Sequence, residues 1–412
     1  MPHGGNIWAG LDVGVETTSF CVIDDAGCIL QQGTCPTRVE CLHKELRWLR
    51  RRRLARVGIE ATSSFSLARG LQGLGYSIDL YETRQLSKFL RVRRNKTDAG
   101  DAIGIAEAGR LGGAILSKVF LKSFECQSLQ SQLTVRRNLI RQRVAIMNLL
   151  CRQIEQYGGR VAGVKRSREF RERLEAEMRK VFGKARTPLT VALHQLFDRW
   201  QQLVTYQAQI DRELNRVACD NDVCRRFMEI PGVGPVCALS FYAAVGEPHR
   251  FTRSTDIGAY FGLTPKVHQS GLTARAGRIS RMGNRAVRSL LTRSSSIVMR
   301  TNGPASELRS WALQIEARRG RGRARVALAR KLAVVMVAMW KKDQRFTPQI
   351  CLDEPSPPLE SAESQTPFVP GRNIARADCW GRPTALDSFE PVSGGEPVSE
   401  RADAGALASA EA

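Results

Sequence analysis

The first 111 residues alternate short apolar runs with segments of helical periodicity, and few folds can accommodate that order. Three apolar runs within residues 6–35 predict strands, and the DDAG turn predicts a hairpin between the second and the third. The other predicted elements are a helix at 38–54, a strand at RVGIEATSS, a helix at 65–75, a strand at SIDLYETR, and a helix from Thr97 or Asp98 to about Leu111. The order β-β-β-α-β-α-β-α predicts one α/β domain with a mixed sheet, which we place at residues 1–122.

The chain changes character after this domain, because helical periodicity takes over. Residues 123–226 predict two long helices joined near Tyr157, with a break in the second helical tract at Gly183 and Pro188. The two tracts predict an antiparallel hairpin or a coiled-coil oligomerisation arm, and an ordinary helical subdomain is an equal alternative.

The last two predicted units differ from each other in composition. Residues 227–345 predict a mainly α-helical domain with a loop-rich insert at 262–284. Residues 346–412 are rich in Pro, Ser, Gly and acids and have few apolar side chains. Such a composition cannot offset the entropy lost on ordering, so we expect a disordered acidic tail.

The charge of the chain is strongly positive and unevenly distributed. Lys and Arg number 63 against 40 Asp and Glu, which gives a net charge of +23. Residues 351–412 hold eleven acids against four Arg and no Lys, a net −7, so that residues 1–350 carry +30. Each phosphate neutralised by such a surface releases counterions, and the charge therefore favours a nucleic-acid partner over a merely soluble basic protein.

Cysteine usage and hydropathy indicate the compartment. The eleven cysteines include no CxxC pair, and the first residues lack the apolar stretch of a signal peptide. The longest purely apolar run, 332–340, is too short to span a bilayer. We expect a cytoplasmic, nucleoid-associated protein with reduced thiols, no zinc site and no membrane segment.

Four carboxylates occupy element ends in the N-terminal domain. Asp12 ends the run IWAGLD, and Glu60 ends RVGIE. Asp98 and Asp101 lie three residues apart in KTDAGDA, on one face of the predicted helix. Taken singly, each acid is better explained as a helix cap, a first-turn acid or a solvated strand end. Together they predict a site for magnesium, a hard cation that takes oxygen ligands and clamps phosphodiesters.

Two segments of the C-terminal domain are candidates for nucleic-acid contact. EIPGVGPVCALSFYAAVG has the pattern of a helix-hairpin-helix, in which the turn at Gly232 and Gly234 can hold a phosphate without reading bases. The following loop places Ser270 next to a glycine, with Ser280 as a competing candidate nucleophile. The cationic side chains expected to bind phosphate there are Lys266, His268, Arg275, Arg278 and Arg281. Composition alone favours Ser270 as a turn residue.

Together these motifs resemble the insertion-sequence one-ten family of transposases. LDVG, IEATSS and KTDAGDA resemble that family's tetrad of acids, the DEDD motif. IPGVGPVCAL, FGLTPKVHQSG and GRISRMGNRAVRSLL resemble its C-terminal transposase domain. The resemblance runs from about residue 6 to residue 340, and the acidic tail has no counterpart in it.

The resemblance implies more than the residues indicate by themselves. The N-terminal domain would have a ribonuclease-H-like fold similar to the RuvC resolvase, with Mg²⁺ held by the four acids. Ser270 would attack DNA and form a phosphoserine link. A structured guide RNA would pair with donor and target DNA, and active sites would combine two subunits of a dimer or tetramer. The alternatives are a RuvC-like structure-specific nuclease and a non-catalytic nucleic-acid-binding protein.

Overall fold

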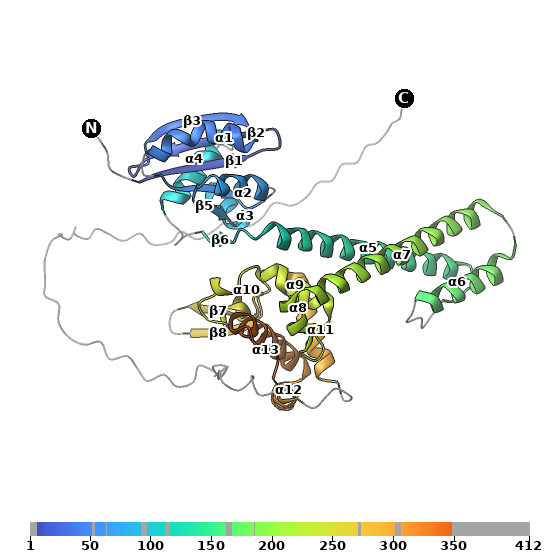
Figure 1. Ribbon diagram of the computed structural model, residues 1–412. Coiled ribbons are helices and arrows are strands. Elements are labelled where there is room, and N and C mark those ends of the chain that lie inside the picture. Colours follow the sequence, from blue (N-terminus) through green and yellow to red (C-terminus); the bar gives the residue numbers. More distant parts are fainter. Residues whose placement is uncertain are drawn as a thin grey trace, which may run out of the picture. The chain divides into compact units, whose positions relative to one another are not determined.

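The protein is described from a computed structural model (Figure 1). The described residues are 6–51, 54–62, 64–91, 97–111, 116–161, 167–184, 186–270, 273–300 and 306–347. The predicted tail at 346–412 lies outside them from residue 348 onward. Among the described helices, none combines the length and the apolarity needed to cross a bilayer.

The N-terminal domain is built on a mixed sheet, as the sequence predicts, but the sheet has six strands and not the five expected. The strand order is β3-β2-β1-β4-β5-β6, in which β1–β4 and β4–β5 are parallel and the other pairs are antiparallel. The strands are β1 Ile7–Val13, β2 Thr17–Ile23, β3 Ile29–Pro36, β4 Leu54–Glu60, β5 Ile78–Tyr81 and β6 Lys118–Val119. The parallel strands β1 and β4 therefore lie at the centre of the sheet.

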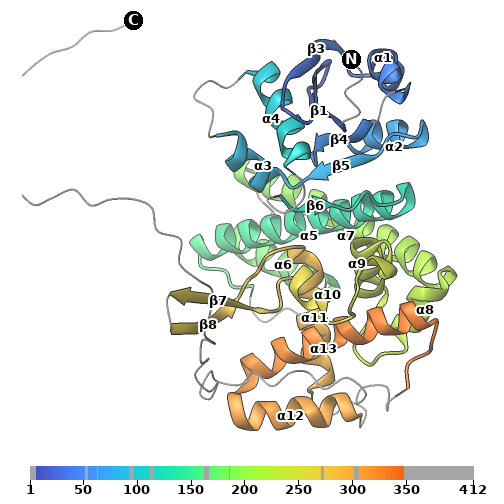
Figure 2. The same ribbon diagram turned by 90° about the vertical axis from the view of Figure 1, so that its left-hand side faces the viewer.

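Helices cover both faces of this sheet (Figure 2). Side chains of a strand alternate between faces, so Ile7, Ala9 and Leu11 enter one core, together with apolar residues of α1, η1 and α2. The opposite face packs against α4, where Cys21 and Ile23 of β2 meet Ala102 and Ala106. The helical elements are α1 Val39–Leu46, η1 Arg47–Arg51, α2 Phe65–Gly73, α3 Thr83–Leu90 and α4 Asp98–Arg110.

Four details of the predicted domain need correction. The helix expected at 38–54 ends earlier, because α1 passes into the 3-10 turn η1 and β4 begins at Leu54. The helix was predicted too long because Leu42, Leu46 and Leu49 have helical spacing. All three are buried, although Leu49 lies in η1. Helix α3 and the two-residue strand β6 were not expected, and SIDLYETR continues as a strand only to Tyr81.

The middle of the chain forms an antiparallel pair of long helices, α5 Phe124–Gln156 and α7 Pro188–Asp220. An ion pair between Arg136 and Asp211 and a shared core containing Leu150 and Trp200 fix the antiparallel direction. The break predicted in the second tract is confirmed, because α6 Ser167–Phe182 ends one residue before Gly183 and α7 begins at Pro188. A capping box at Thr187 starts α7.

The C-terminal part of the chain is mainly helical, as expected. Its core takes in the base of the long helices, because Leu129 of α5 and Leu214 of α7 belong to it. The insert predicted as loop at 262–284 instead contains an antiparallel hairpin, β7 Pro265–Ser270 and β8 Thr273–Ile279. The helical elements are α8 Asp222–Met228, α9 Pro235–Val245, η2 Pro248–Arg250, α10 Asp256–Tyr260, α11 Arg285–Val298, α12 Glu307–Arg319 and α13 Arg321–Lys342.

Candidate active site

Asp12 and Glu60 lie at the same end of the central strands. The parallel register pairs Leu11 of β1 with Ile59 of β4, so the next residue on each strand is one of the two acids. Both acids are partly buried. Residues in register on neighbouring parallel strands project from the same face of the sheet, so the two carboxylates share a face and an edge.

Two glycines let helix α4 lie directly on this face. A Cβ atom at Gly10 would stand 2.2 Å from the carbonyl oxygen of Ala102 and 2.3 Å from the amide nitrogen of Ala106. A Cβ atom at Gly58 would stand 2.8 Å from the Tyr81 ring and 3.0 Å from the Ile105 side chain. Only a residue without a side chain fits at Gly10, because the opposing atoms are backbone.

Helix α4 runs antiparallel to β1, which brings its first turn to the acidic edge. Ala102 contacts the position of Gly10, whereas Gly109, farther along the helix, lies beside Trp8, earlier in the strand. The N-terminal turn of α4 therefore lies toward the end of β1 that carries Asp12.

Asp98 and Asp101 belong to that N-terminal turn. Thr97 caps the helix, because its hydroxyl accepts a hydrogen bond from the amide of Gly100 at 3.1 Å. Asp98 is exposed and Asp101 is half-buried. Since strand side chains alternate, Asp12 shares the face of Gly10 and Glu60 that of Gly58, both covered by α4. All four acids thus come from elements that converge on one end and one face of the sheet.

The donor chemistry of this edge suits a hard divalent cation. Within the residues that the structure describes, no three His, Cys, Asp or Glu side chains are grouped closely enough to hold one metal ion. Magnesium does not require such a cage, because it usually takes one or two carboxylates and completes its shell with phosphate oxygens and water. The arrangement fits an ion that binds together with a nucleic-acid phosphate.

Asp79 is a buried acid of the same domain that the sequence analysis did not single out. It stands beside Gly58 in the register of β4 and β5, and its side chain is 5% exposed. Arg56 Nη1 lies 3.0 Å and Lys118 Nζ 2.7 Å from its carboxylate oxygens. Burial and the Asp79 charge raise the pKa of Tyr81. Through these two ion pairs, Asp79 of β5 links β4 and β6. The signal in the sequence was an acid inside the apolar run SIDLY.

The turn predicted to hold phosphate connects α8 to α9. Gly232 has a φ of 82°, and a Cβ atom there would stand 2.8 Å from the carbonyl oxygen of Ser294 in α11. This glycine therefore serves packing. Gly234 precedes α9, and a Cβ atom at its position would meet nothing within 4 Å. Of the two glycines, Gly234 offers the accessible backbone.

Ser270 is the last residue of β7 and pairs with Thr273 across the hairpin. Its backbone is described, but its side chain lies outside the described part of the chain, as do those of His268 and Arg275. Lys266 and Arg278 are exposed residues nearer the base of the hairpin. The predicted nucleophile thus stands at the tip, beside the two-residue connection between the strands.

Ser280 occupies the base of the hairpin instead. Its amide donates to the carbonyl oxygen of Thr264 at 2.8 Å, and its hydroxyl accepts from the amide of Met282 at 3.4 Å. These contacts make Ser280 part of the turn that leads into α11.

Cationic side chains crowd the turn that follows Ser280. The guanidinium of Arg288 donates to the carbonyl oxygens of Phe261 and Met282 at 2.8 and 3.0 Å. Burial, followed by the charges of Arg281 and Arg285, lowers the pKa of Arg288. Arg281 itself is exposed and has a φ of 55°. Such mutual repulsion is relieved when an anion binds, which suits phosphate contact.

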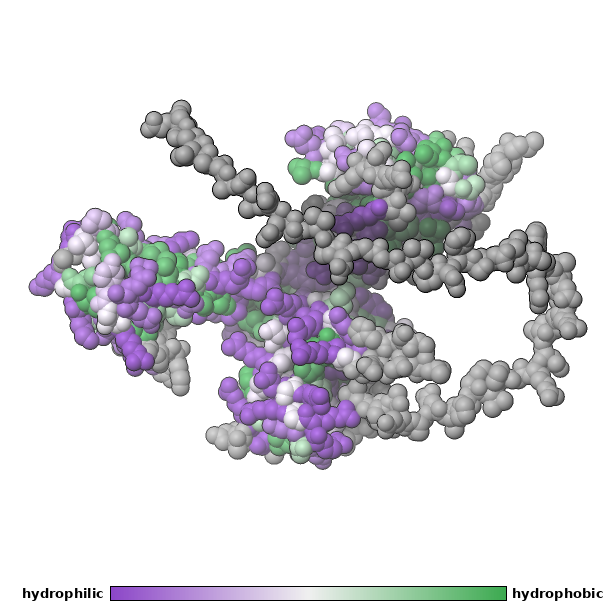
Figure 3. All heavy atoms as spheres, turned by 180° about the vertical axis from the view of Figure 1, so that it is seen from behind, coloured by the Kyte–Doolittle hydropathy of each residue, from purple (hydrophilic) through white to green (hydrophobic). Residues whose placement is uncertain are grey.

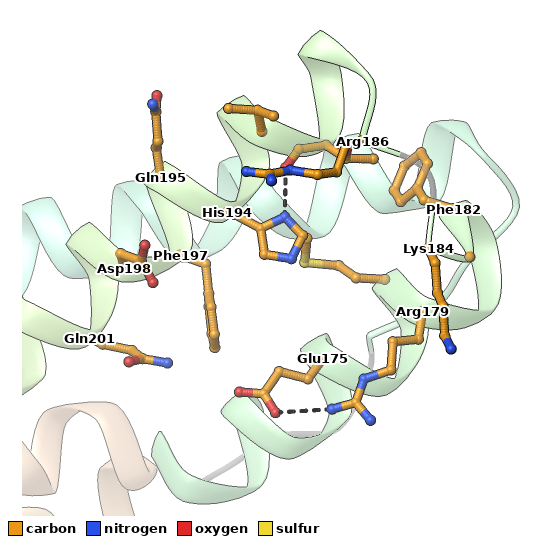
Figure 4. A pocket seen from close by; sticks show the side chains of 14 residues that line it. Glu175, Arg179, Phe182, Lys184, Arg186, His194, Gln195, Phe197, Asp198 and Gln201 are labelled. Carbon is orange, nitrogen blue, oxygen red and sulfur yellow. Dashed lines mark hydrogen bonds and ion pairs between the residues drawn. The ribbon is translucent and has the colours of Figure 1, made fainter.

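A pocket of about 670 Å³ lies in the helical arm, between α6 and α7 (Figure 4). The ring of His194 points into it, and Nδ1 of that ring is 2.6 Å from the carbonyl oxygen of Thr190. Across the pocket, Glu175 and Arg179 form an ion pair at 3.6 Å. None of the predicted site residues lines this pocket.

Comparison with known proteins bears on both halves of the chain. Residues 9–158 match the profile of the DEDD transposases of the IS110 type, and residues 224–309 match that of the transposase IS116/IS110/IS902 family. The chain is 32% identical over 281 residues to the transposase for insertion sequence element IS1111A of Coxiella burnetii, covering 68% of this chain and 75% of that protein. It is 28% identical over 295 residues to a probable family 20 transposase of Pseudomonas aeruginosa, covering 71% and 86% respectively.

The fold and these matches define a DEDD transposase, with a RuvC-like N-terminal domain and a mainly helical remainder. The chain belongs to the IS116/IS110/IS902 family of insertion-sequence transposases. Enzymes of this class cleave DNA and transfer its strands, and the DEDD domain implies a divalent cation. The expected enzyme class and family are therefore confirmed.

Proposed function

We propose that this transposase cuts and rejoins DNA at a two-part site made of the acidic edge and Ser270. The observation that carries the proposal is the convergence of four acids on one end and one face of the sheet, enforced by the contact of α4 with Gly10. Asp12, Glu60, Asp98 and Asp101 would hold Mg²⁺ in one- or two-carboxylate ligand sets. The bound ion would supply charge stabilisation at the phosphate undergoing displacement.

Ser270 would act as the nucleophile of the cutting step. Its Oγ forms a bond to phosphorus, the bond from phosphorus to one sugar oxygen breaks, and the departing oxygen takes up a proton. Rejoining reverses the step, because a sugar hydroxyl of another strand attacks the phosphoserine and releases Ser270. No high-energy cofactor is needed, since the energy of the broken phosphodiester is kept in the phosphoserine bond.

The cationic residues of the C-terminal part would bind the DNA during these steps. Lys266 and Arg278 on the hairpin and Arg281 at its base are exposed and suited to phosphate contact. His268 and Arg275 would contribute from the hairpin strands. The open backbone at Gly234 would complete a helix-hairpin-helix contact to the sugar–phosphate chain, with Gly232 fixing the turn.

A structured guide RNA and a dimer or tetramer complete the proposal. The net +30 of residues 1–350 is large enough to accommodate RNA in addition to DNA. The antiparallel pair α5–α7 would serve as the oligomerisation arm that brings an acidic edge and a Ser270 from different subunits together. Sequencing of RNA that copurifies with the protein tests the guide, and one discrete structured species is the expected result.

The test of the two-part site follows covalent capture of DNA. Wild-type protein incubated with donor DNA and Mg²⁺ is expected to yield a protein–DNA adduct that survives denaturation. Ser270→Ala should abolish the adduct, whereas Ser280→Ala, at the base of the same hairpin, should retain it. Loss of the adduct only in Ser280→Ala would identify Ser280 as the nucleophile. Cleavage without any adduct, lost in Asp12→Asn but not in Ser270→Ala, would instead indicate a RuvC-like nuclease.

A further inference from the structure

The turn between α12 and α13 carries the densest group of exposed cations in the described C-terminal helices. Within residues 316–326 there are five arginines and one acid. We call these five the arginine elbow, and all are exposed: Arg318, Arg319, Arg321, Arg323 and Arg325. The elbow lies beyond residue 309, where the matched family profile ends, and the predicted hairpin and glycine-turn contacts do not include it.

The backbone of the elbow is held firmly from inside. Ala324 and Leu328 of α13 are fully buried, and Ala312 of α12 is buried in the same core. Gly320 joins the two helices directly, with a φ of 80°. The guanidinium groups therefore project from a fixed turn, so that binding an extended anion would not require the backbone to become ordered.

Carboxylates do little to neutralise Arg318, Arg321, Arg323 and Arg325. Glu316 Oε1 is 3.9 Å from Arg321 Nε, at the limit of an ion pair, and that arginine side chain is 67% exposed. Among the described residues, no carboxylate lies within ion-pairing distance of Arg323 or Arg325. Arg318 donates only to the carbonyl oxygen of Gln314, at 3.3 Å. These four arginines of the elbow therefore have charge available for an external partner.

The free approach to the elbow indicates what kind of partner fits. A Cβ atom at Gly320 or Gly322 would meet nothing within 4 Å, so the turn itself is open to solvent. Figure 3 shows a largely hydrophilic surface over the part of the molecule that contains α12. Guanidinium groups dominate the exposed side chains of the turn, and a chain of phosphates matches their close spacing.

We infer that the arginine elbow is a second nucleic-acid-binding surface, which grips the sugar–phosphate backbone of DNA or RNA without reading sequence. The inference rests on the proposed function only in that a nucleic acid is the partner. It adds a contact outside the hairpin and the glycine turn, and it predicts that the elbow contributes affinity and not chemistry.

The experiment measures binding of full-length protein to a 30-base-pair DNA duplex and to an RNA duplex of equal length, as a function of salt and without Mg²⁺. In the triple variant Arg321→Gln, Arg323→Gln, Arg325→Gln, the slope of log affinity against log salt should fall in magnitude by about two to three. Affinity near 0.1 M salt should fall by about tenfold or more. The three Arg→Lys changes should restore the slope, because they preserve the charge.

A matched control removes the same charge from the helical arm. Arg199, Arg212 and Arg216 are exposed on α7, and their triple change to Gln should leave the slope nearly intact. A slope reduced for DNA alone, for RNA alone or for both identifies the backbone that the elbow binds. An unchanged slope in the elbow variant, or an equal loss in the arm control, overturns the inference. Neither result would bear on covalent capture of DNA by Ser270, which the adduct experiment tests separately.

Discussion

The acidic edge and the serine hairpin are built in contrasting ways. Asp12 and Glu60 lie on the central strands of a six-stranded sheet, and helix α4, which carries Asp98 and Asp101, covers them closely only because Gly10 has no side chain. Ser270 sits at the tip of a two-stranded hairpin. A two-stranded hairpin is marginal by itself, whereas a helix-covered sheet positions groups rigidly. The acidic half of the proposed site is therefore organised in advance, and we propose that the serine half is brought to it.

The base of the hairpin shows where its rigidity ends. Gly283 has a φ of 76°, and a Cβ atom there would lie 2.0 Å from the carbonyl oxygen of Tyr260. The amide of Arg281 donates to Gly262 at 3.2 Å. These contacts anchor the start and the end of the hairpin in the helical core. Ser270 is five residues beyond Pro265 along β7, roughly 17 Å at the usual strand rise. If Ser270 reacts as proposed, we expect DNA or a partner subunit to fix the tip.

The largest expected effect belongs to the acidic edge. Asp12→Asn removes the negative charge of a proposed Mg²⁺ ligand at the end of β1, and DNA cleavage in Mg²⁺ should fall at least about a thousandfold, roughly 4 kcal/mol in the barrier. DNA binding and the thermal midpoint should change little. The control is Asp25→Asn in the turn between β2 and β3, at the opposite end of the sheet, which should keep near-wild-type cleavage. Equal losses in both variants would contradict the metal role.

The next effect tests the rigid packing under the acids. Gly10→Ala forces a methyl group into backbone atoms of α4, and we expect a loss of about 2 to 4 kcal/mol in unfolding free energy, together with reduced cleavage. Urea unfolding followed by circular dichroism measures the loss. Gly73→Ala places the same methyl group in open space at the end of α2 and should be neutral or slightly stabilising. A harmless Gly10→Ala would refute the tight packing.

Asp79 offers a smaller test of the same domain. Asp79→Asn leaves Arg56 and Lys118 without their shared buried partner, but those side chains are 50% and 40% exposed and can be solvated. We therefore expect a loss of about 1 to 3 kcal/mol, below the usual cost of breaking a fully buried pair. Asp211→Asn, which removes a carboxylate that is 35% exposed from an ion pair on the arm, should cost less in the same urea titration. The reverse ranking would contradict this account of Asp79.

The last test concerns Lys122, which lies between β6 and α5, and its expected effect is no larger than that at Asp79. Burial, with the charge of Arg250 as the second cause, lowers the pKa of Lys122 to about 8 from its usual 10.5. The unfolded chain then holds this proton more tightly, so stability should rise as pH increases from about 8 to about 10.5. Lys122→Met should remove this rise and stabilise the protein at pH 7 by about 1 to 3 kcal/mol. The measurement is the thermal midpoint across this pH range, with Lys88→Met as the exposed control. Parallel curves of midpoint against pH for wild type and Lys122→Met would refute the role of Lys122.

Much of the acidic half could be predicted from the sequence because its signals are local. Apolar runs that end in Asp12 and Glu60 predict strands with acids at their ends, and Thr97 is a recognisable helix cap. The parallel pairing that brings those ends together is a long-range contact, so the sequence alone left it open. Asp79 was missed because its partners Arg56 and Lys118 come from strands that meet only in the folded sheet.

The serine half was harder to predict. We predicted a loop at 262–284 because glycines and cationic residues there resemble turn signals more than strand signals. The structure instead has a hairpin in this segment. Ser270 and Ser280 look alike in sequence, and only strand register separates the tip from the base. The glycine that follows Ser270 gives no local signal of the serine's role, since any exposed glycine turn would have the same composition.

The most direct test of the central claim asks whether the acids and the serine act in one reaction. Wild-type protein, Asp12→Asn and Ser270→Ala are incubated with donor DNA in Mg²⁺, and the covalent adduct is quantified and mapped by peptide sequencing. The account predicts an adduct on Ser270 in the wild type, lost in both variants and on removal of the divalent cation. An adduct on Ser270 that forms equally well in Asp12→Asn would contradict the account, because the acidic edge would then take no part in the cut.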